Sequence, residues 1–179
     1  MQHHDLWHDI PPGVKAPDVV YAVVEIPRGS RNKYEYSKHL GVITLSRVLF
    51  SPMHYPGDYG FIPQTCGDDH DPLDVLVMVT EPSFPGCVIE ARPIGVFHMQ
   101  DRGEEDDKIL AVPDADPLFG EYHCIKDVPS HFLTEVSHFF ETYKQLEGIL
   151  VTAKGWEDAK EARKCIQRAV QSYKKMYCS

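Results

Sequence analysis

Two acidic clusters place the strongest constraint on how this chain folds. In the first, residues 68–74, four of seven residues are Asp, and in the second, residues 101–107, five of seven are Asp or Glu. Carboxylates packed this densely repel one another unless cations are bound. The most apolar stretch of the chain lies between the clusters, so we expect a folded site rather than a disordered acidic tail. The pattern predicts a site that assembles several Mg²⁺ ions and acts on a phosphate substrate.

Length, charge and cysteine usage indicate one compact enzyme domain. A chain of 179 residues can bury a sizeable core. The net charge of -9 argues against nucleic acid and anionic membranes as partners. Five scattered cysteines, odd in number and without a C-x-x-C pair, favour reduced thiols. We therefore expect a cytoplasmic protein that binds a small molecule.

The strand pattern predicts a β-barrel. β-Branched runs and alternating segments separated by Pro and Gly turns are typical of short strands that close on themselves. The Pro27–Ser30 turn sequence, for example, ends the first run. The predicted strands cover residues 19–26, 32–37, 41–50, 59–62, 73–80, 88–99 and 108–112.

Two helices and an N-terminal arm complete the predicted architecture. Apolar residues at helical spacing predict one helix with Ser130 as its N-cap and a second over residues 156–177. Residues 1–18, rich in Pro and His, are expected to form an extended arm whose apolar side chains pack back on the body. Residues 19–179 are expected to form a single domain. The predicted fold class is α+β, mainly β, with two principal α-helices flanking the barrel.

The first acidic cluster combines a stiff loop with the start of a buried strand. Asp74 begins the apolar strand and shares a face with Leu76, so its carboxylate should point inward. Asp69 and Asp71 lie on the loop, which Pro72 stiffens. Converging carboxylates on a stiff loop suit the octahedral coordination of Mg²⁺.

Other interpretations of these clusters fit the sequence less well. An EF-hand needs Gly at its sixth position and Glu at its twelfth, and Pro72 interrupts the loop. A phosphatase with an aspartyl nucleophile usually has an apolar strand before its D-x-D, whereas Gly67 precedes the cluster here. For the first cluster, a solvated acidic loop is the simplest alternative. The second cluster, taken alone, is typical of an acidic hairpin loop. Lys108 and the cations of the strand region favour a phosphate site instead.

The residues of the first cluster resemble a known family. Segment 69–75, DHDPLDV, is similar to the D-x-D-(P/E)-x-D signature of family I soluble inorganic pyrophosphatases. The resemblance runs in order over about residues 20–175. It implies a five-stranded, OB-like closed β-barrel and the hydrolysis of pyrophosphate to two orthophosphates. It also implies several Mg²⁺ ions per active site, with Mn²⁺ or Zn²⁺ as possible substitutes.

The same resemblance implies a role for each polar residue of the site. Five carboxylates are implied as metal ligands: Asp69, Asp74, Asp101, Asp106 and Glu35. Phosphate contacts are implied for Lys33, Arg47, Tyr59, Lys108, Tyr143 and Lys144. Asp71 would accept a proton from the nucleophilic water, assisted in catalysis by Tyr59, Lys33 and Arg47. Glu25 and Tyr55 would complete the polar cavity.

One residue departs from the family pattern, and two other functions stay open. Arg102 stands where many bacterial members carry Glu, which leaves any metal or water contact at that position in doubt. The resemblance also implies a homo-oligomer, expected to be a hexamer. Another metal-dependent phosphohydrolase is one alternative. A non-catalytic OB-like binding module is the other, opposed by the acidic charge and the lack of an aromatic-basic stripe.

Overall fold

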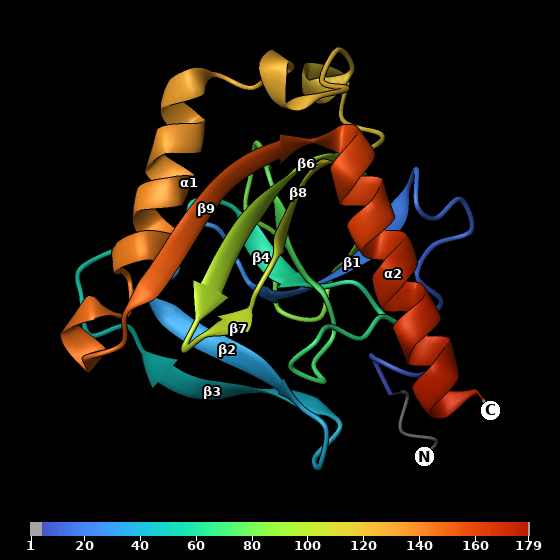
Figure 1. Ribbon diagram of the computed structural model, residues 1–179, viewed down its shortest axis with the longest axis horizontal. Coiled ribbons are helices and arrows are strands. Elements are labelled where there is room, and N and C mark those ends of the chain that lie inside the picture. The colour runs from blue at the N-terminus through green and yellow to red at the C-terminus, as the bar shows by residue number, and fades with distance from the viewer. Residues whose placement is uncertain (1–4, 179) are drawn as a thin grey trace.

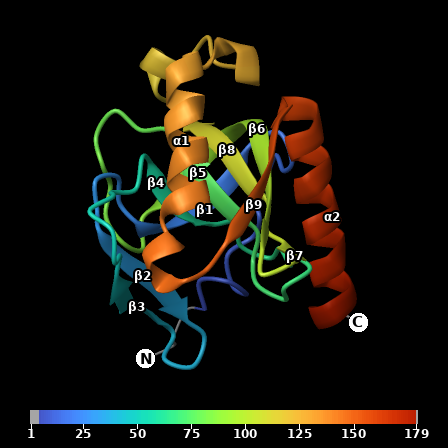
Figure 2. The ribbon, with the colours of Figure 1, turned by 60° about the vertical axis from the view of Figure 1, so that its left-hand side comes forward.

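Five strands of the computed structural model, which describes residues 5–178, close into a ring. Within the ring each strand pairs with two others, in the order β1-β4-β5-β8-β6 and back to β1 (Figure 1 and Figure 2). The β5–β8 pair is parallel and the other four pairs are antiparallel. The ring confirms the predicted fold class. Its strands are β1 (Val20–Ile26), β4 (Asp58–Phe61), β5 (Asp74–Val77), β6 (Val88–Asp101) and β8 (Lys108–Pro113).

Two helices cover opposite sides of the ring, because alternate residues of its strands present two apolar faces (Figure 2). On β5, Leu76 packs in a buried cluster with the apolar residues of α1 (Ser130–Thr142). Its neighbours Val75 and Val77 pack in another cluster with those of α2 (Ala159–Tyr177). Asp74 lies on the α1 side with Leu76, as predicted.

Both helix starts differ from the prediction. The N-cap of α1 is Pro129, because the extended backbone ends there and Ser130 already takes the first helical position. The second helix begins at Ala159, where the Asp158 side chain accepts a 2.8 Å hydrogen bond from the Ala159 N–H. Trp156 is therefore not helical. It belongs to β9 (Val151–Asp158), a strand that the sequence analysis missed and that pairs with β6.

The remaining elements extend the ring at its edges. A second, two-stranded sheet lies beside it and consists of β2 (Asn32–Ser37) and β3 (Val42–Val48). The short strand β7 (Glu104–Glu105) pairs with the end of β6. Three 3-10 helices connect the larger elements: η1 (Pro117–Phe119), η2 (Ile125–Asp127) and η3 (Gln145–Glu147). Several strands are shorter than predicted, β5 most of all, because pairing ends before the apolar run does.

The described part of the N-terminal arm packs on the body, as expected. The Trp7 side chain is only 2% exposed and lies in a buried cluster with Phe61 and Tyr173, against which Leu6 and Ile10 also pack. The Trp7 indole N–H donates a 2.9 Å hydrogen bond to the carbonyl of Thr65. The arm is thus fixed to the rest of the chain through its apolar side chains. Residues 1–4 of the predicted arm, and residue 179 of the predicted domain, lie outside the described residues.

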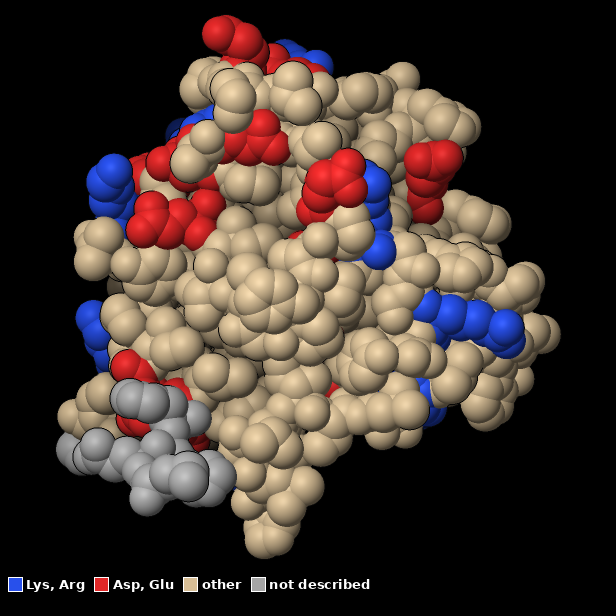
Figure 3. All heavy atoms as spheres, turned by 180° about the vertical axis from the view of Figure 1, so that it is seen from behind, with Lys and Arg blue, Asp and Glu red and all other residues tan. Residues whose placement is uncertain are grey.

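The outer surface carries its charges unevenly. On the face seen from behind, Asp and Glu side chains gather in a few groups, while the visible Lys and Arg side chains are scattered (Figure 3). This view of the described residues therefore offers no continuous basic stripe. Within residues 5–178, no helix is long and apolar enough to cross a membrane.

Candidate active site

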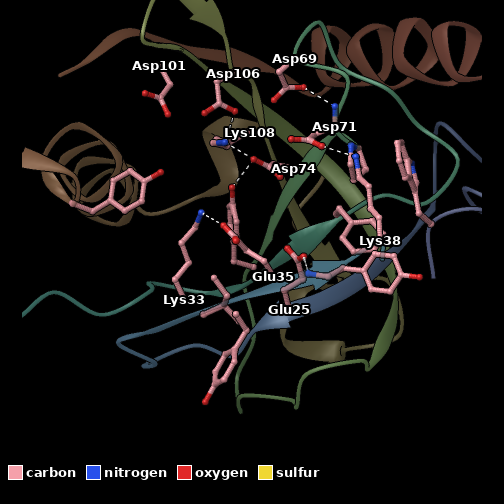
Figure 4. A pocket seen from close by; sticks show the side chains of 18 of the residues that line it. Glu25, Lys33, Glu35, Lys38, Asp69, Asp71, Asp74, Asp101, Asp106 and Lys108 are labelled. Atoms are coloured by element: carbon pink, nitrogen blue, oxygen red, sulfur yellow. Dashed lines mark hydrogen bonds and ion pairs between the residues drawn. The ribbon is translucent and has the colours of Figure 1, made fainter. Parts of the chain in front are cut away.

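Most of the predicted site residues meet in one cavity of about 370 Å³. The cavity lies beside β1, β2, β5 and the start of β8, next to the C-terminal end of α1 (Figure 4). Twelve of the fourteen predicted residues line it: Glu25, Lys33, Glu35, Tyr59, Asp69, Asp71, Asp74, Asp101, Asp106, Lys108, Tyr143 and Lys144.

A buried lysine and two carboxylates form the centre of the site. The parallel pairing of β5 with β8 places Asp74 directly opposite Lys108. The Lys108 ammonium, only 3% exposed, donates hydrogen bonds to both Asp74 and Asp106. Burial alone would lower the pKa of Lys108, but the two carboxylates raise it, so the side chain stays charged. Tyr59 on β4 donates a 2.6 Å hydrogen bond to Asp74 and completes this group.

The carboxylates around this centre carry more negative charge than the nearby lysines neutralise. Burial raises the pKa of Asp69, and its acidic neighbours Asp71 and Asp74 raise it further. Burial also raises the pKa of Asp106, and Asp74 adds to that effect although Lys108 opposes it. Asp101 accepts a hydrogen bond from Lys144 through Oδ2, while its buried Oδ1 has no hydrogen-bond partner. An unsatisfied buried carboxylate oxygen indicates that a donor or a cation is still to be bound.

These residues fit hard divalent cations in their chemistry. Across residues 5–178, no group of three or more His, Cys, Asp or Glu side chains is close enough together to hold a metal ion as it stands. Lysine ammonium groups instead contact the carboxylates of Asp74, Asp101 and Asp106. However, the described residues that line the cavity include seven carboxylates and neither His nor Cys, and one carboxylate oxygen, Oδ1 of Asp101, is unsatisfied. Such a donor set is the one that Mg²⁺ prefers.

A second group of side chains consists of Glu25 on β1 and the pair Lys33 and Glu35 on β2. Lys33 and Glu35 form a 2.5 Å ion pair, and Lys33 lowers the pKa of Glu35 although partial burial would raise it. Glu25 behaves in the opposite way, because burial raises its pKa to about 8. Its Oε1 accepts a 2.6 Å hydrogen bond from the Tyr36 N–H, which only partly offsets the loss of hydration.

The second acidic cluster is a tight hairpin, as predicted, but β6 extends to Asp101, beyond the expected end at residue 99. Asp101 pairs with Glu104, and the two residues between them, Arg102 and Gly103, have φ of 52° and 88°. Positive φ at both positions is typical of a type I′ turn. Arg102 is exposed at this turn and does not line the cavity, so the departure from the family pattern lies outside the site. Asp107 does not line the cavity, and its carboxylate contacts His98 at 2.7 Å.

Two predicted residues lie outside the cavity lining. The Arg47 guanidinium is held by Glu147, with a 3.0 Å contact between Nη2 and Oε2 and a 3.2 Å hydrogen bond from Nε to Oε1. Tyr55 is buried behind the cavity, with its ring centroid 5.3 Å from that of Tyr59. Its hydroxyl has no hydrogen-bond partner among the described residues. These contacts use Nε and Nη2 of Arg47, which leaves Nη1 as a donor for another partner.

Lys38 and Trp7 are among the lining residues to which the sequence assigned no role. The Lys38 ammonium lies 2.7 Å from Oδ1 of Asp71 and 4.1 Å from the centroid of the Trp7 ring. Lys38 directly follows β2. The sequence shows its positive charge but not which side chains it contacts. The approach of Trp7 depends on how the arm folds back, which no local pattern specifies.

The fold and the cavity together define a carboxylate-rich site for phosphate chemistry, of the kind that metal-dependent phosphohydrolases use. The family model described as inorganic pyrophosphatase matches residues 22–174. An inorganic pyrophosphatase of Haloferax volcanii is 51% identical over 174 residues, covering 97% of this chain and 98% of that protein. One of Geobacillus stearothermophilus is 49% identical, covering 87% and 94%. The crystal structure of inorganic pyrophosphatase from Thermus thermophilus superimposes with a TM-score of 0.93 at 45% identity, covering 96% and 99% of the two chains. The chain belongs to the inorganic pyrophosphatase family, which confirms the resemblance.

Proposed function

We propose that this protein hydrolyses inorganic pyrophosphate to two orthophosphates with the help of Mg²⁺. Membership of the inorganic pyrophosphatase family supports the reaction. The observation that carries it in the structure is that carboxylates and lysines share one cavity. Lys33, Lys108 and Lys144 line the same space as the acidic residues. A site for a highly charged anion together with its metal ions requires both kinds of group.

Five carboxylates would hold the metal ions: Asp69, Asp74, Asp101, Asp106 and Glu35. Their oxygen donors fit Mg²⁺, and Mn²⁺ or Zn²⁺ are possible substitutes. Bound divalent ions lower the pKa of a water molecule and neutralise phosphate oxygens. The lysines that now contact Asp74, Asp101 and Asp106 would then be released to contact phosphate oxygens.

Asp71 would accept the proton of the attacking water. It lies at the cavity rim with its carboxylate exposed, which leaves it accessible to water. Burial and the carboxylates of Asp74 and Asp106 raise the pKa of Tyr59, so its hydroxyl stays protonated and can donate a hydrogen bond. The proposed phosphate contacts are Lys33, Arg47, Tyr59, Lys108, Tyr143 and Lys144. Glu25 and Tyr55 support the cavity from β1 and from behind.

We also propose how the chain is organised and where it works. Residues 19–179 form the catalytic domain and residues 1–18 the arm. The protein is a homo-oligomer, proposed as a hexamer on its similarity in length to bacterial relatives such as that of Thermus thermophilus. All five cysteines are free thiols, which supports the cytoplasm as the compartment.

Phosphate release tests the proposed reaction directly. The purified protein is incubated with pyrophosphate, with a nucleoside triphosphate or with a phosphate monoester, each with Mg²⁺ and with EDTA. We expect rapid release from pyrophosphate in the presence of Mg²⁺, and slow release in every other arm. Comparable rates with the nucleotide or the monoester would instead support a different phosphohydrolase. A rate that EDTA leaves unchanged would refute the metal dependence.

A further inference from the structure

We propose that Lys38 is a positioning residue for Asp71, and that Trp7 of the N-terminal arm holds Lys38 in place. This inference rests on the proposed function, because it assumes that Asp71 accepts the proton of the attacking water. It adds the arm to the active site. The family model match begins at residue 22, so Trp7 lies outside the matched segment.

The contact between Lys38 and Asp71 would be weak by itself. The distance between Nζ and Oδ1 is 2.7 Å, but the two side chains are 49% and 63% exposed. Water and dissolved ions screen such a pair, and ordering a long lysine side chain costs conformational entropy. A further contact is therefore needed to keep the ammonium beside the carboxylate.

Trp7 provides that contact. The Lys38 ammonium lies 4.1 Å from the centroid of the indole ring, within the range of a cation-π interaction. The ring is a rigid platform, because it is buried and its N–H is bonded to the Thr65 carbonyl. It also packs edge to face against Tyr177, with a centroid distance of 5.4 Å and an interplanar angle of 71°. The platform limits the positions that the Lys38 side chain can adopt.

A second set of contacts ties the arm to β2, the strand that leads to Lys38. The Tyr36 hydroxyl donates a 3.1 Å hydrogen bond to the carboxylate of Asp5 and accepts one of 3.2 Å from the Leu6 N–H. Both bonds are made by the two residues directly before Trp7. The indole and the end of β2 are therefore fixed relative to each other. This arrangement keeps the Lys38 ammonium close to the face of the Trp7 ring.

Hydrogen bonds to Asp69 and Gly67 fix the backbone of Asp71, whereas its carboxylate is contacted by Lys38. The Asp71 N–H donates a 3.0 Å hydrogen bond to Oδ1 of Asp69, and its carbonyl accepts one of 2.8 Å from the Gly67 N–H. Among residues 5–178, Lys38 is the one residue that forms an ion pair with the Asp71 carboxylate (Figure 4). We infer that Lys38 sets the direction of this carboxylate toward the cavity.

Steady-state kinetics of four variants test the proposal. Lys38→Met removes the ammonium and should lower kcat about 5- to 10-fold while KM for magnesium pyrophosphate changes less than about twofold. Lys38→Arg keeps a cation that can stack on the indole and should restore most of the rate. Trp7→Leu should lower kcat to a similar extent. Lys126→Met, at an exposed lysine on η2 outside the cavity, is the matched control and should match the wild type.

The combination of Trp7→Leu with Lys38→Met tests whether the two residues act together. Because they act in series, the double variant should be no more than about twofold slower than the slower single variant. If the fold-losses in kcat of the two single variants multiply in the double variant, Trp7 does not act through Lys38, and its proposed role is overturned. An unchanged kcat in Lys38→Met would overturn the role of Lys38, and so would a raised KM with normal kcat, which indicates a direct substrate contact.

Two precautions keep these outcomes separate from other failures. Trp7 is buried, so folding of Trp7→Leu is checked by circular dichroism, and Trp7→Phe replaces it if it unfolds. Trp7→Phe keeps an aromatic face but weakens the cation-π interaction, and should lower kcat about 2- to 3-fold. The wild type is measured first: inactivity toward pyrophosphate would refute the proposed function, whereas an active wild type with an equally active Lys38→Met refutes this inference alone.

Discussion

Replacing Glu25 by Gln should stabilise the metal-free protein, and the gain should grow with pH. Glu25 lies beside the cavity on β1, where burial raises its pKa to about 8 from an ordinary value of 4.5. Gln has nearly the same shape and keeps the oxygen that accepts the Tyr36 N–H. The substitution therefore removes the ionisable group and leaves the main contact in place.

The direction in which stability changes with pH follows from proton binding by Glu25. Between pH 4.5 and about 8, the folded protein keeps a proton on Glu25 that the unfolded chain has lost. Stability therefore falls as the pH rises through this interval, by about 1.4 kcal/mol per pH unit. At pH 7 the wild-type Glu25 lowers the free energy of unfolding by up to about 3 kcal/mol, which Glu25→Gln should recover.

Urea denaturation in EDTA at pH 4.5, 6, 7 and 8 measures this difference. The two proteins should have nearly equal stability at pH 4.5 and diverge steadily up to pH 8. Glu121→Gln, at an exposed glutamate outside the cavity, is the control and should follow the wild type. A constant difference across the pH range, or the same divergence in Glu121→Gln, would refute the assigned pKa of Glu25 as its cause.

Three further outcomes follow from the proposed roles. Asp71→Asn should reduce turnover roughly 10²- to 10⁴-fold without changing the melting temperature by much, since it removes a proton acceptor and keeps the shape; near-normal phosphate release at neutral pH would exclude that role. Asp74→Ala and Asp106→Ala should raise the Mg²⁺ concentration needed for half-maximal activity more than Asp107→Ala, and superimposable Mg²⁺ titrations would contradict the ligand assignment. Light scattering should give a mass about six times that of the 20.4 kDa chain, and a monomer mass would rule out the assembly.

Short-range patterns predicted the ring of strands well but failed where tertiary pairing decides. The β-branched runs of β1 and β8 were located to within one residue at each end. By contrast, β9 was missed, and its last three residues, 156–158, were assigned to the helix that follows. Residues 151–158 form a strand because β6 is long enough to pair with them.

The site shows the same division between local and long-range information. The acidic motif predicted carboxylates that line the cavity, because Asp69 and Asp71 lie on the loop that enters the strand of Asp74. Contacts between distant segments were not predictable in this way. Arg47 is paired with a glutamate 100 residues further along the chain, and Lys38 with an aspartate 33 residues further along. Which partner a surface cation takes depends on packing that no sequence spacing encodes.

Closure of the ring determines where this chain is open to unintended association. Every strand of the ring has neighbours on both sides, so its backbone groups are already paired and cannot template another chain. In the described residues, β3 pairs with β2 on one side only, and three of its apolar side chains, Val42, Leu45 and Val48, are exposed. During refolding from denaturant, aggregation should therefore begin at β3, and a lysine introduced at position 45 should raise the yield of soluble protein.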